Sequence, residues 1–169
     1  MKTDVKKLTL MSALVAVAMV LSYIESLIPA FVAVPGVKIG LSNIATVFAL
    51  YILGAPAAIT VSAVRVCLSA LLFGNFVSLI YSVFGAILAL ITMILLKRFA
   101  PFSEIGVSVA GGVAHNAGQV LAACLVMENA ALSAYFAHLA VSGVIAGIVV
   151  GAAAGALVKR LGALKNYRN

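Results

Sequence analysis

The sequence predicts an all-α integral membrane protein whose single domain is a bundle of six transmembrane helices. Hydrophobic residues make up 65% of the 169 residues and charged residues only 9%. The apolar residues gather in repeated runs of about 20, the length that crosses the hydrocarbon core of a bilayer. Basic residues stand at the ends of these runs, where positive charge sets the orientation of a membrane protein.

Breaks at Pro, Gly and paired basic residues define the individual segments. The first run follows Lys6 and Lys7 as in a signal peptide, but it continues well past the usual length and shows no clear cleavage site, so we expect an uncleaved span. Residues 29–40 (PAFVAVPGVKIG) are too rich in Pro and Gly for a helix and too apolar for a fully solvated loop. The six helices are expected at about residues 8–27, 41–53, 57–73, 76–96, 105–127 and 132–158.

The distribution of charge predicts the orientation. If both termini are cytoplasmic, as short tails at about residues 1–7 and 159–169, nine of the eleven Lys and Arg residues lie on the cytoplasmic side. Only Lys38 is then external, and Arg65 lies within a span. We therefore expect a multi-pass protein of the cell (plasma) membrane, in contact with membrane lipid. The net charge of +7 reflects this topology and not nucleic-acid binding.

Strongly polar side chains inside the apolar runs predict the functional site. A charge or strong hydrogen-bonding group at bilayer depth costs a few kcal/mol and therefore tends to face a cavity, a partner or water. In the fifth segment, His115, Asn116 and Gln119 lie on one stripe of a helix together with Ser108 and Gly112. This arrangement favours a polar cavity over internal packing. The polar residues within the runs are Glu25, Arg65, His115, Asn116 and Gln119.

Arg65 lies roughly 14 Å into its helix, too deep to reach the surface easily. It needs an acid, carbonyl groups, water or an anionic ligand. Two interpretations stay open: a buried pair with Glu25, the only acid within a span, or contact with a substrate anion. Lys38 and Asn43 flank the start of the short second helix, where backbone N–H groups favour anions. The polar set predicts a substrate pocket that opens outwards beneath the loop at 29–40.

Two small-residue faces predict close helix contacts. The sixth segment repeats GxxxG three times in register, a pattern that lets helix backbones touch. The contact is either internal to the chain or a sliding face against another subunit. The first segment carries a smaller face near its cytoplasmic end, which suits internal packing or the docking of a partner. The two faces consist of Gly143, Gly147, Gly151 and Gly155, and of Ser12, Ala13 and Ala16.

Three stretches together resemble a known family: LSYIESLIPAFVAVPGVKIGLSNIATVFALYILG, RVCLSALLFGNFVSLIYSVFGAILAL and GVSVAGGVAHNAGQ. Over about residues 8–160 the chain resembles the Gx transporter family, whose members are also labelled heptaprenyl diphosphate synthase component I. That family is in turn similar to the substrate-binding S-components of energy-coupling factor (ECF) transporters. The resemblance implies a six-helix protein that binds a vitamin-like solute from outside. It also implies a transmembrane coupling subunit, docked on the face of Ser12, Ala13 and Ala16, and two cytoplasmic ATPases.

The synthase label is not matched by catalytic residues. Prenyl diphosphate synthases hold Mg²⁺ with Asp-rich clusters, and this chain has one aspartate, Asp4, in its N-terminal tail. Neither a phosphate-binding P-loop nor a nucleophile–base pair is visible. Cys67 and Cys124 lie inside apolar runs without ligand spacing. We therefore expect no catalytic residue, metal site or cofactor, and any ATP-driven transport must use a separate motor.

Three functions are compatible with these features. The leading hypothesis is an S-component-like subunit of an uptake transporter that captures a vitamin-like or isoprenoid- or quinone-related molecule. The second is a non-catalytic structural subunit of a polyprenyl or quinone synthesis complex, in which the polar residues only hold helices together. The third is a proton-coupled carrier that uses Glu25 and His115, because histidine titrates near neutral pH.

Overall fold

The computed structural model describes residues 2–27, 40–74, 76–99 and 102–162, and these ranges are almost entirely helical, with no strand among them. The prediction of an all-α protein is therefore confirmed. The elements in chain order are α1 (Lys2–Leu27), α2 (Asn43–Ile52), α3 (Ala55–Phe73), α4 (Phe76–Phe99), α5 (Glu104–Val126), the 3₁₀ helix η1 (Ala130–Tyr135) and α6 (Phe136–Arg160).

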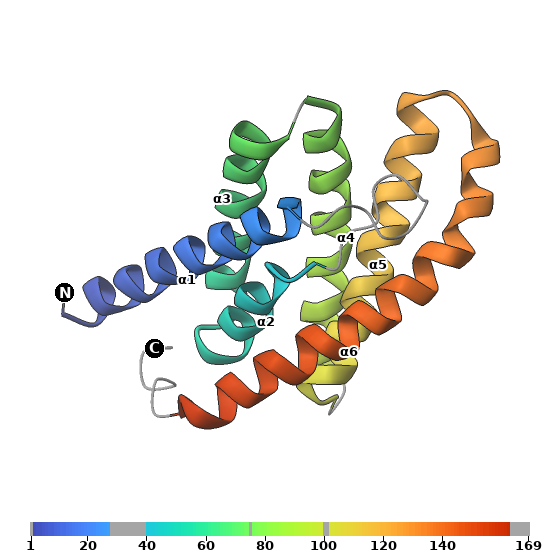
Figure 1. Ribbon diagram of the computed structural model, residues 1–169. Coiled ribbons are helices and arrows are strands. Elements are labelled where there is room, and N and C mark those ends of the chain that lie inside the picture. The colour runs from blue at the N-terminus through green and yellow to red at the C-terminus, as the bar shows by residue number, and fades with distance from the viewer. Residues whose placement is uncertain (1, 28–39, 75, 100–101, 163–169) are drawn as a thin grey trace.

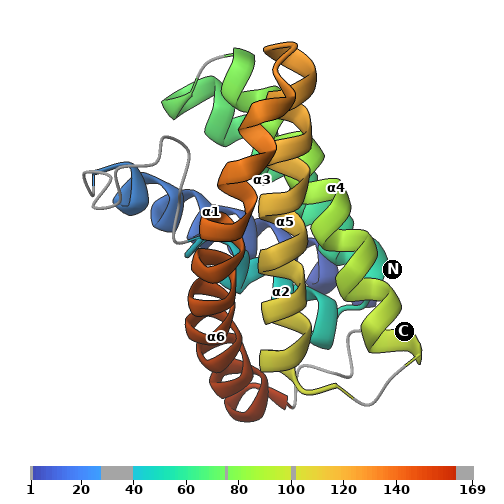
Figure 2. The ribbon, with the colours of Figure 1, turned by 90° about the vertical axis from the view of Figure 1, so that its right-hand side faces the viewer.

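The helices form a bundle in which α5 is central. Helix α5 packs along α4 on one side and along α6 on the other, and these are the most extensive contacts between elements. Figure 1 shows that α3 ends and α4 begins at one end of the bundle, near the end of α5, whereas α5 begins and α6 ends at the other. Helix α1 is steeply inclined to α4 and α5 in both ribbon views (Figures 1 and 2).

Five helical segments of the described chain are long and apolar enough to cross a membrane: Val5–Leu27, Ala55–Phe73, Phe76–Phe99, Glu104–Val126 and Ala130–Arg160. Helix α2 differs, because it has 10 residues and rises only about 15 Å, half the hydrocarbon thickness of a bilayer. The second predicted span is therefore a half-length helix. The six-span topology and the cytoplasmic position of both termini stay predictions.

Helix α2 is the most completely buried helix of the described chain. All of its residues from Ala45 to Leu50 are buried, and they form much of the hydrophobic core with residues from each of the other α-helices. The helix ends at Ile52, and Gly54 follows two residues later with a φ of 92°, in the left-handed region that glycine tolerates best. Pro56 then stands in the first turn of α3, where its missing N–H costs no hydrogen bond. A buried half-length helix places its N-terminus in the interior of the bundle.

A lysine from α4 holds the other end of α2. The Lys97 ammonium donates a hydrogen bond to the carbonyl oxygen of Leu50 in the last turn of α2. It also lies 4.7 Å from the centroid of the Tyr51 ring, and the Tyr51 hydroxyl donates to the Phe102 carbonyl at 3.3 Å. A cation is favoured here because the C-terminus of a helix carries partial negative charge.

Replacing Lys97 with methionine is expected to lower the free energy of unfolding by about 1–3 kcal/mol. The variant keeps the apolar stem but loses a charged hydrogen bond and a cation–π contact. Thermal unfolding of the purified protein in mild detergent measures the change. The neighbouring Arg98 is exposed, so Arg98→Met is the matched control and should unfold like the parent protein. Equal unfolding temperatures for the two variants would contradict this role of Lys97.

Candidate functional site

A cavity of about 100 Å³ lies between the helices, and every α-helix contributes to its wall. It brings together six residues that the sequence selected from four separate segments. Lys38 and the loop at 29–39 lie outside the described residues. The six residues on the wall are Glu25, Asn43, Arg65, His115, Asn116 and Gln119.

Arg65 is the main charged group of the cavity. It lies near the middle of α3 and is only 9% exposed. One guanidinium nitrogen, Nη1, donates to the hydroxyl oxygen of Ser42 at 2.8 Å. The Nε atom is buried and has no hydrogen-bond partner within the described part of the chain. Because a buried polar group without a partner is costly, this nitrogen marks an unfilled acceptor position.

Glu25 does not neutralise Arg65 by direct contact. Its Oε1 atom accepts a hydrogen bond from the backbone N–H of Gly40 at 2.5 Å. Among the described residues no ion pair within 4.0 Å joins Glu25 to Arg65. The buried ion pair, one of the two interpretations of Arg65, is therefore not formed. Glu25 instead ties the end of α1 to the residues that precede α2.

The N-terminus of α2 also faces the cavity. Serine at this position usually caps the helix with its hydroxyl group, but Ser42 makes no such hydrogen bond and accepts from Arg65 instead. The backbone N–H groups of Asn43 and Ile44 bond to the carbonyls of Gly40 and Leu41. The partial positive charge of the helix end thus adds to that of Arg65.

Ser42 is the functional candidate that the sequence analysis missed. Its signal was its place directly before Asn43, at the start of a helix whose first turn was already expected to favour anions. Ser22 and Ser26 on α1 also line the cavity and were missed. With Glu25 they follow the spacing of one helix face, which is a pattern that sequence analysis could have used.

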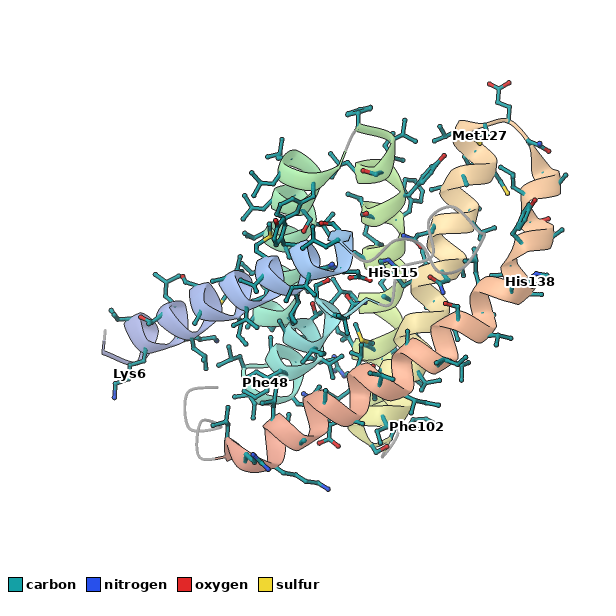
Figure 3. The ribbon with its side chains drawn as sticks, in the orientation of Figure 1. Lys6, Phe48, Phe102, His115, Met127 and His138 are labelled. Atoms are coloured by element: carbon teal, nitrogen blue, oxygen red, sulfur yellow. The ribbon has the colours of Figure 1, made fainter. Side chains whose placement is uncertain are left out.

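Two residues of the polar stripe on α5, Asn116 and His115, make different contacts. Asn116 is 8% exposed, and its Nδ2 atom donates to the carbonyl of Leu139 on α6 at 2.6 Å. It therefore joins two helices as well as lining the cavity. His115 packs on Gly85 of α4, where an added Cβ atom would come within 2.8 Å of the histidine Cε1 atom. Figure 3 shows His115 in the interior of the molecule and His138, on α6, at its edge.

The glycine face of α6 holds the α5 stripe in place. Gly143, Gly147 and Gly151 are buried against α5. A Cβ atom at Gly147 would lie 2.5 Å from the Cα atom of Val109, and one at Gly151 would lie 2.6 Å from that of Ile105. This part of the glycine face is thus occupied within the chain and leaves no room for a sliding subunit. Only at Gly155 is the nearest atom at an ordinary contact distance, 3.5 Å.

The small-residue face of α1 has a different environment. Ser12, Ala13 and Ala16 are all exposed, so no other helix of the described chain covers them. They do not take part in internal packing, the first of the two interpretations.

The cavity combines a buried cation, a helix N-terminus and an acid with apolar walls such as Val66 and Phe73. A few polar groups set among apolar side chains are typical of small-molecule pockets in proteins. Within the described residues, no group of three or more His, Cys, Asp or Glu side chains is placed to hold a metal ion.

Comparison with known proteins places the chain in a family. No curated protein and no solved structure matched the sequence. Residues 14–157 match the family described as heptaprenyl diphosphate synthase component I, which confirms the family resemblance found in the sequence. The matched range includes all six predicted residues on the cavity wall and excludes Ser12 and Ala13. The chain therefore belongs to the heptaprenyl diphosphate synthase component I family.

Proposed function

We propose that this protein is the membrane-embedded substrate-binding subunit of an uptake transporter in the cell membrane, similar to an ECF S-component. The observation that carries the proposal is the buried Arg65 guanidinium on the cavity wall, whose Nε atom has no partner among the described residues. A protein that used Arg65 only for packing would be expected to satisfy all of its donors. An acceptor group of a bound solute would supply the missing hydrogen-bond partner of the Arg65 Nε atom.

The cavity limits the kind of solute. An anionic or strongly polar group would bind Arg65, and a ring system or short prenyl portion would contact Val66 and Phe73. Vitamin-like molecules and isoprenoid- or quinone-related molecules both meet this description.

Native mass spectrometry of the protein, purified in mild detergent from its own host, tests the proposal. The expected result is a small molecule bound in equal stoichiometry with the chain. An empty cavity in protein purified in this way would contradict a substrate-binding role.

The exposed face of α1 at Ser12, Ala13 and Ala16 is the proposed docking site for a transmembrane coupling subunit that carries two cytoplasmic ATPases. Small residues let a second helix approach closely. Ala16→Trp is therefore expected to reduce co-purification of the ATPases at least about tenfold, because one bulky side chain at a close helix contact costs more than about 1.4 kcal/mol. The bound small molecule should be retained.

Ile91→Trp is the control for that variant. Ile91 is an exposed apolar residue of α4, so the substitution adds the same side chain to a different part of the surface. Co-purification that is unaffected by Ala16→Trp, or reduced equally by both variants, would argue against docking on α1.

The family description supports one alternative, a structural membrane subunit of a polyprenyl synthesis complex. The hydrogen bond from Asn116 to Leu139 is the kind of internal link that this function requires. The alternative predicts that the purified chain carries a synthase partner and has an empty cavity. The same mass spectrometry measurement therefore separates the two functions.

A further inference from the structure

Two opposite charges share the cavity wall without contacting each other. Arg65 uses Nη1 for Ser42 and leaves Nε without a partner. Glu25 uses Oε1 for the Gly40 N–H, and no further hydrogen bond or ion pair to its carboxylate occurs among the described residues. Each charged group therefore keeps hydrogen-bonding capacity for something in the cavity.

We propose that the cavity takes a zwitterionic small molecule, whose carboxylate group binds Arg65 and whose protonated nitrogen binds Glu25. This inference rests on the proposed substrate-binding function and narrows the class of substrate.

The Arg65 side of the cavity is built for an anion. Arg65 is only 9% exposed, so its charge is little screened by water. The N-terminus of α2 opens onto the same wall through Ser42 and Asn43. The N–H groups of Asn43 and Ile44 are bonded to the Gly40 and Leu41 carbonyls, so this helix end contributes its dipole. Helix α2 has 10 residues, enough for its N-terminal dipole to attract negative charge.

The Glu25 side disfavours a ligand that is only anionic. A prenyl diphosphate would bring two or more negative charges into a cavity that already contains a carboxylate, and like charges repel strongly where water is scarce. A ligand with a protonated nitrogen removes this repulsion and adds a charge-assisted hydrogen bond to Glu25.

The start of α2 holds the two charges apart. Gly40 binds Glu25 and Ser42 binds Arg65, so two positions separated by one residue hold the acid from α1 and the base from α3. Gly40 has a φ of 73°, and a Cβ atom there would lie 2.9 Å from the Asn43 Nδ2 atom. The backbone at this point is therefore suited to glycine, and its shape sets the spacing that a zwitterion must match.

The test begins with the full-length protein purified in mild detergent from its own host. Small molecules released by denaturation are passed over a cation exchanger at acid pH and an anion exchanger at alkaline pH, and then weighed by mass spectrometry. A molecule retained on both resins is the expected result. A molecule retained on the anion exchanger alone would overturn the zwitterion inference and leave the binding function standing. Protein without any bound molecule would overturn both.

Two carboxylate-to-amide variants then test whether Glu25 binds the protonated nitrogen of the ligand. The probe is the compound recovered from the parent protein, and the readout is the amount that each variant retains after identical washing. Glu25→Gln is expected to retain at least about tenfold less, because a charged hydrogen bond is lost. Glu104→Gln, at the start of α5 and away from the cavity wall, should match the parent. Parent-level retention by Glu25→Gln would overturn the assignment of Glu25.

Discussion

Replacing Arg65 with alanine is expected to empty the cavity. The affinity for the bound small molecule should fall about thirtyfold or more relative to the parent protein. Truncating one partner of a buried charged pair typically costs about 2–5 kcal/mol of binding free energy. Native mass spectrometry of protein purified from the host measures the occupied fraction directly. The structure leads to this expectation because Arg65 is the one buried cation on the described cavity wall.

The folded state should survive this substitution. Removing Arg65 removes a buried charge and leaves the Ser42 hydroxyl facing the space that the arginine side chain vacates, which is large enough for a water molecule to replace the lost donor. The unfolding temperature should therefore stay close to that of the parent. Arg98→Ala, which removes an exposed arginine at the end of α4, is the matched control and should keep the bound molecule. Full occupancy in Arg65→Ala would contradict the proposed site.

Adding one methyl group at Gly147 is expected to destabilise the protein strongly. A Cβ atom there would lie 2.5 Å from the Val109 Cα atom and 2.9 Å from the Ser108 carbonyl oxygen, and both are backbone atoms that no side-chain rotation can move. Helices α5 and α6 must then separate. We expect the free energy of unfolding to fall by about 1–3 kcal/mol, the usual cost of overpacking a close contact. Because α5 carries His115 and Asn116, occupancy of the cavity should fall as well.

Gly155→Ala is the control for this effect. It makes the same chemical change on the same face, but its nearest atom, the Glu104 Cβ, is at 3.5 Å. The unfolding temperature in detergent should be clearly lower for Gly147→Ala and nearly unchanged for Gly155→Ala. Similar unfolding temperatures for the two variants would mean that α5 and α6 are not packed as closely as the structure has them.

Helix positions could be predicted from the sequence because a helix that spans a bilayer must be apolar over nearly its whole length. Apolar runs end where Pro, Gly or paired charges begin, and the expected segment at 105–127 agrees with α5 at Glu104–Val126 to within one residue at each end. The same rule made Glu25, Arg65 and His115 stand out, because a polar group inside an apolar run has few acceptable environments. All three line the cavity.

The partners of these groups could not be read in the same way. Composition cannot tell that Ser42 accepts from Arg65 or that Glu25 accepts from the Gly40 N–H, because each bond joins segments from different helices. The sequence also treated residues 41–53 as a span. The structure shows instead a helix of 10 residues, α2, shorter than the bilayer core is thick and largely buried by the rest of the chain.

By itself, the sequence determined the class of protein, the helical segments and the polar residues worth examining, since hydrophobicity and helix period are local properties that each segment carries on its own. Tertiary structure alone decided that α2 is a buried half-length helix and that Arg65 and Glu25 stay apart. It also decided that the glycine face of α6 is filled by α5 and that the small residues of α1 stay exposed. These outcomes depend on which helices lie side by side, and packing between distant segments settles that, because close contact and hydrogen bonding require the whole fold to be in place.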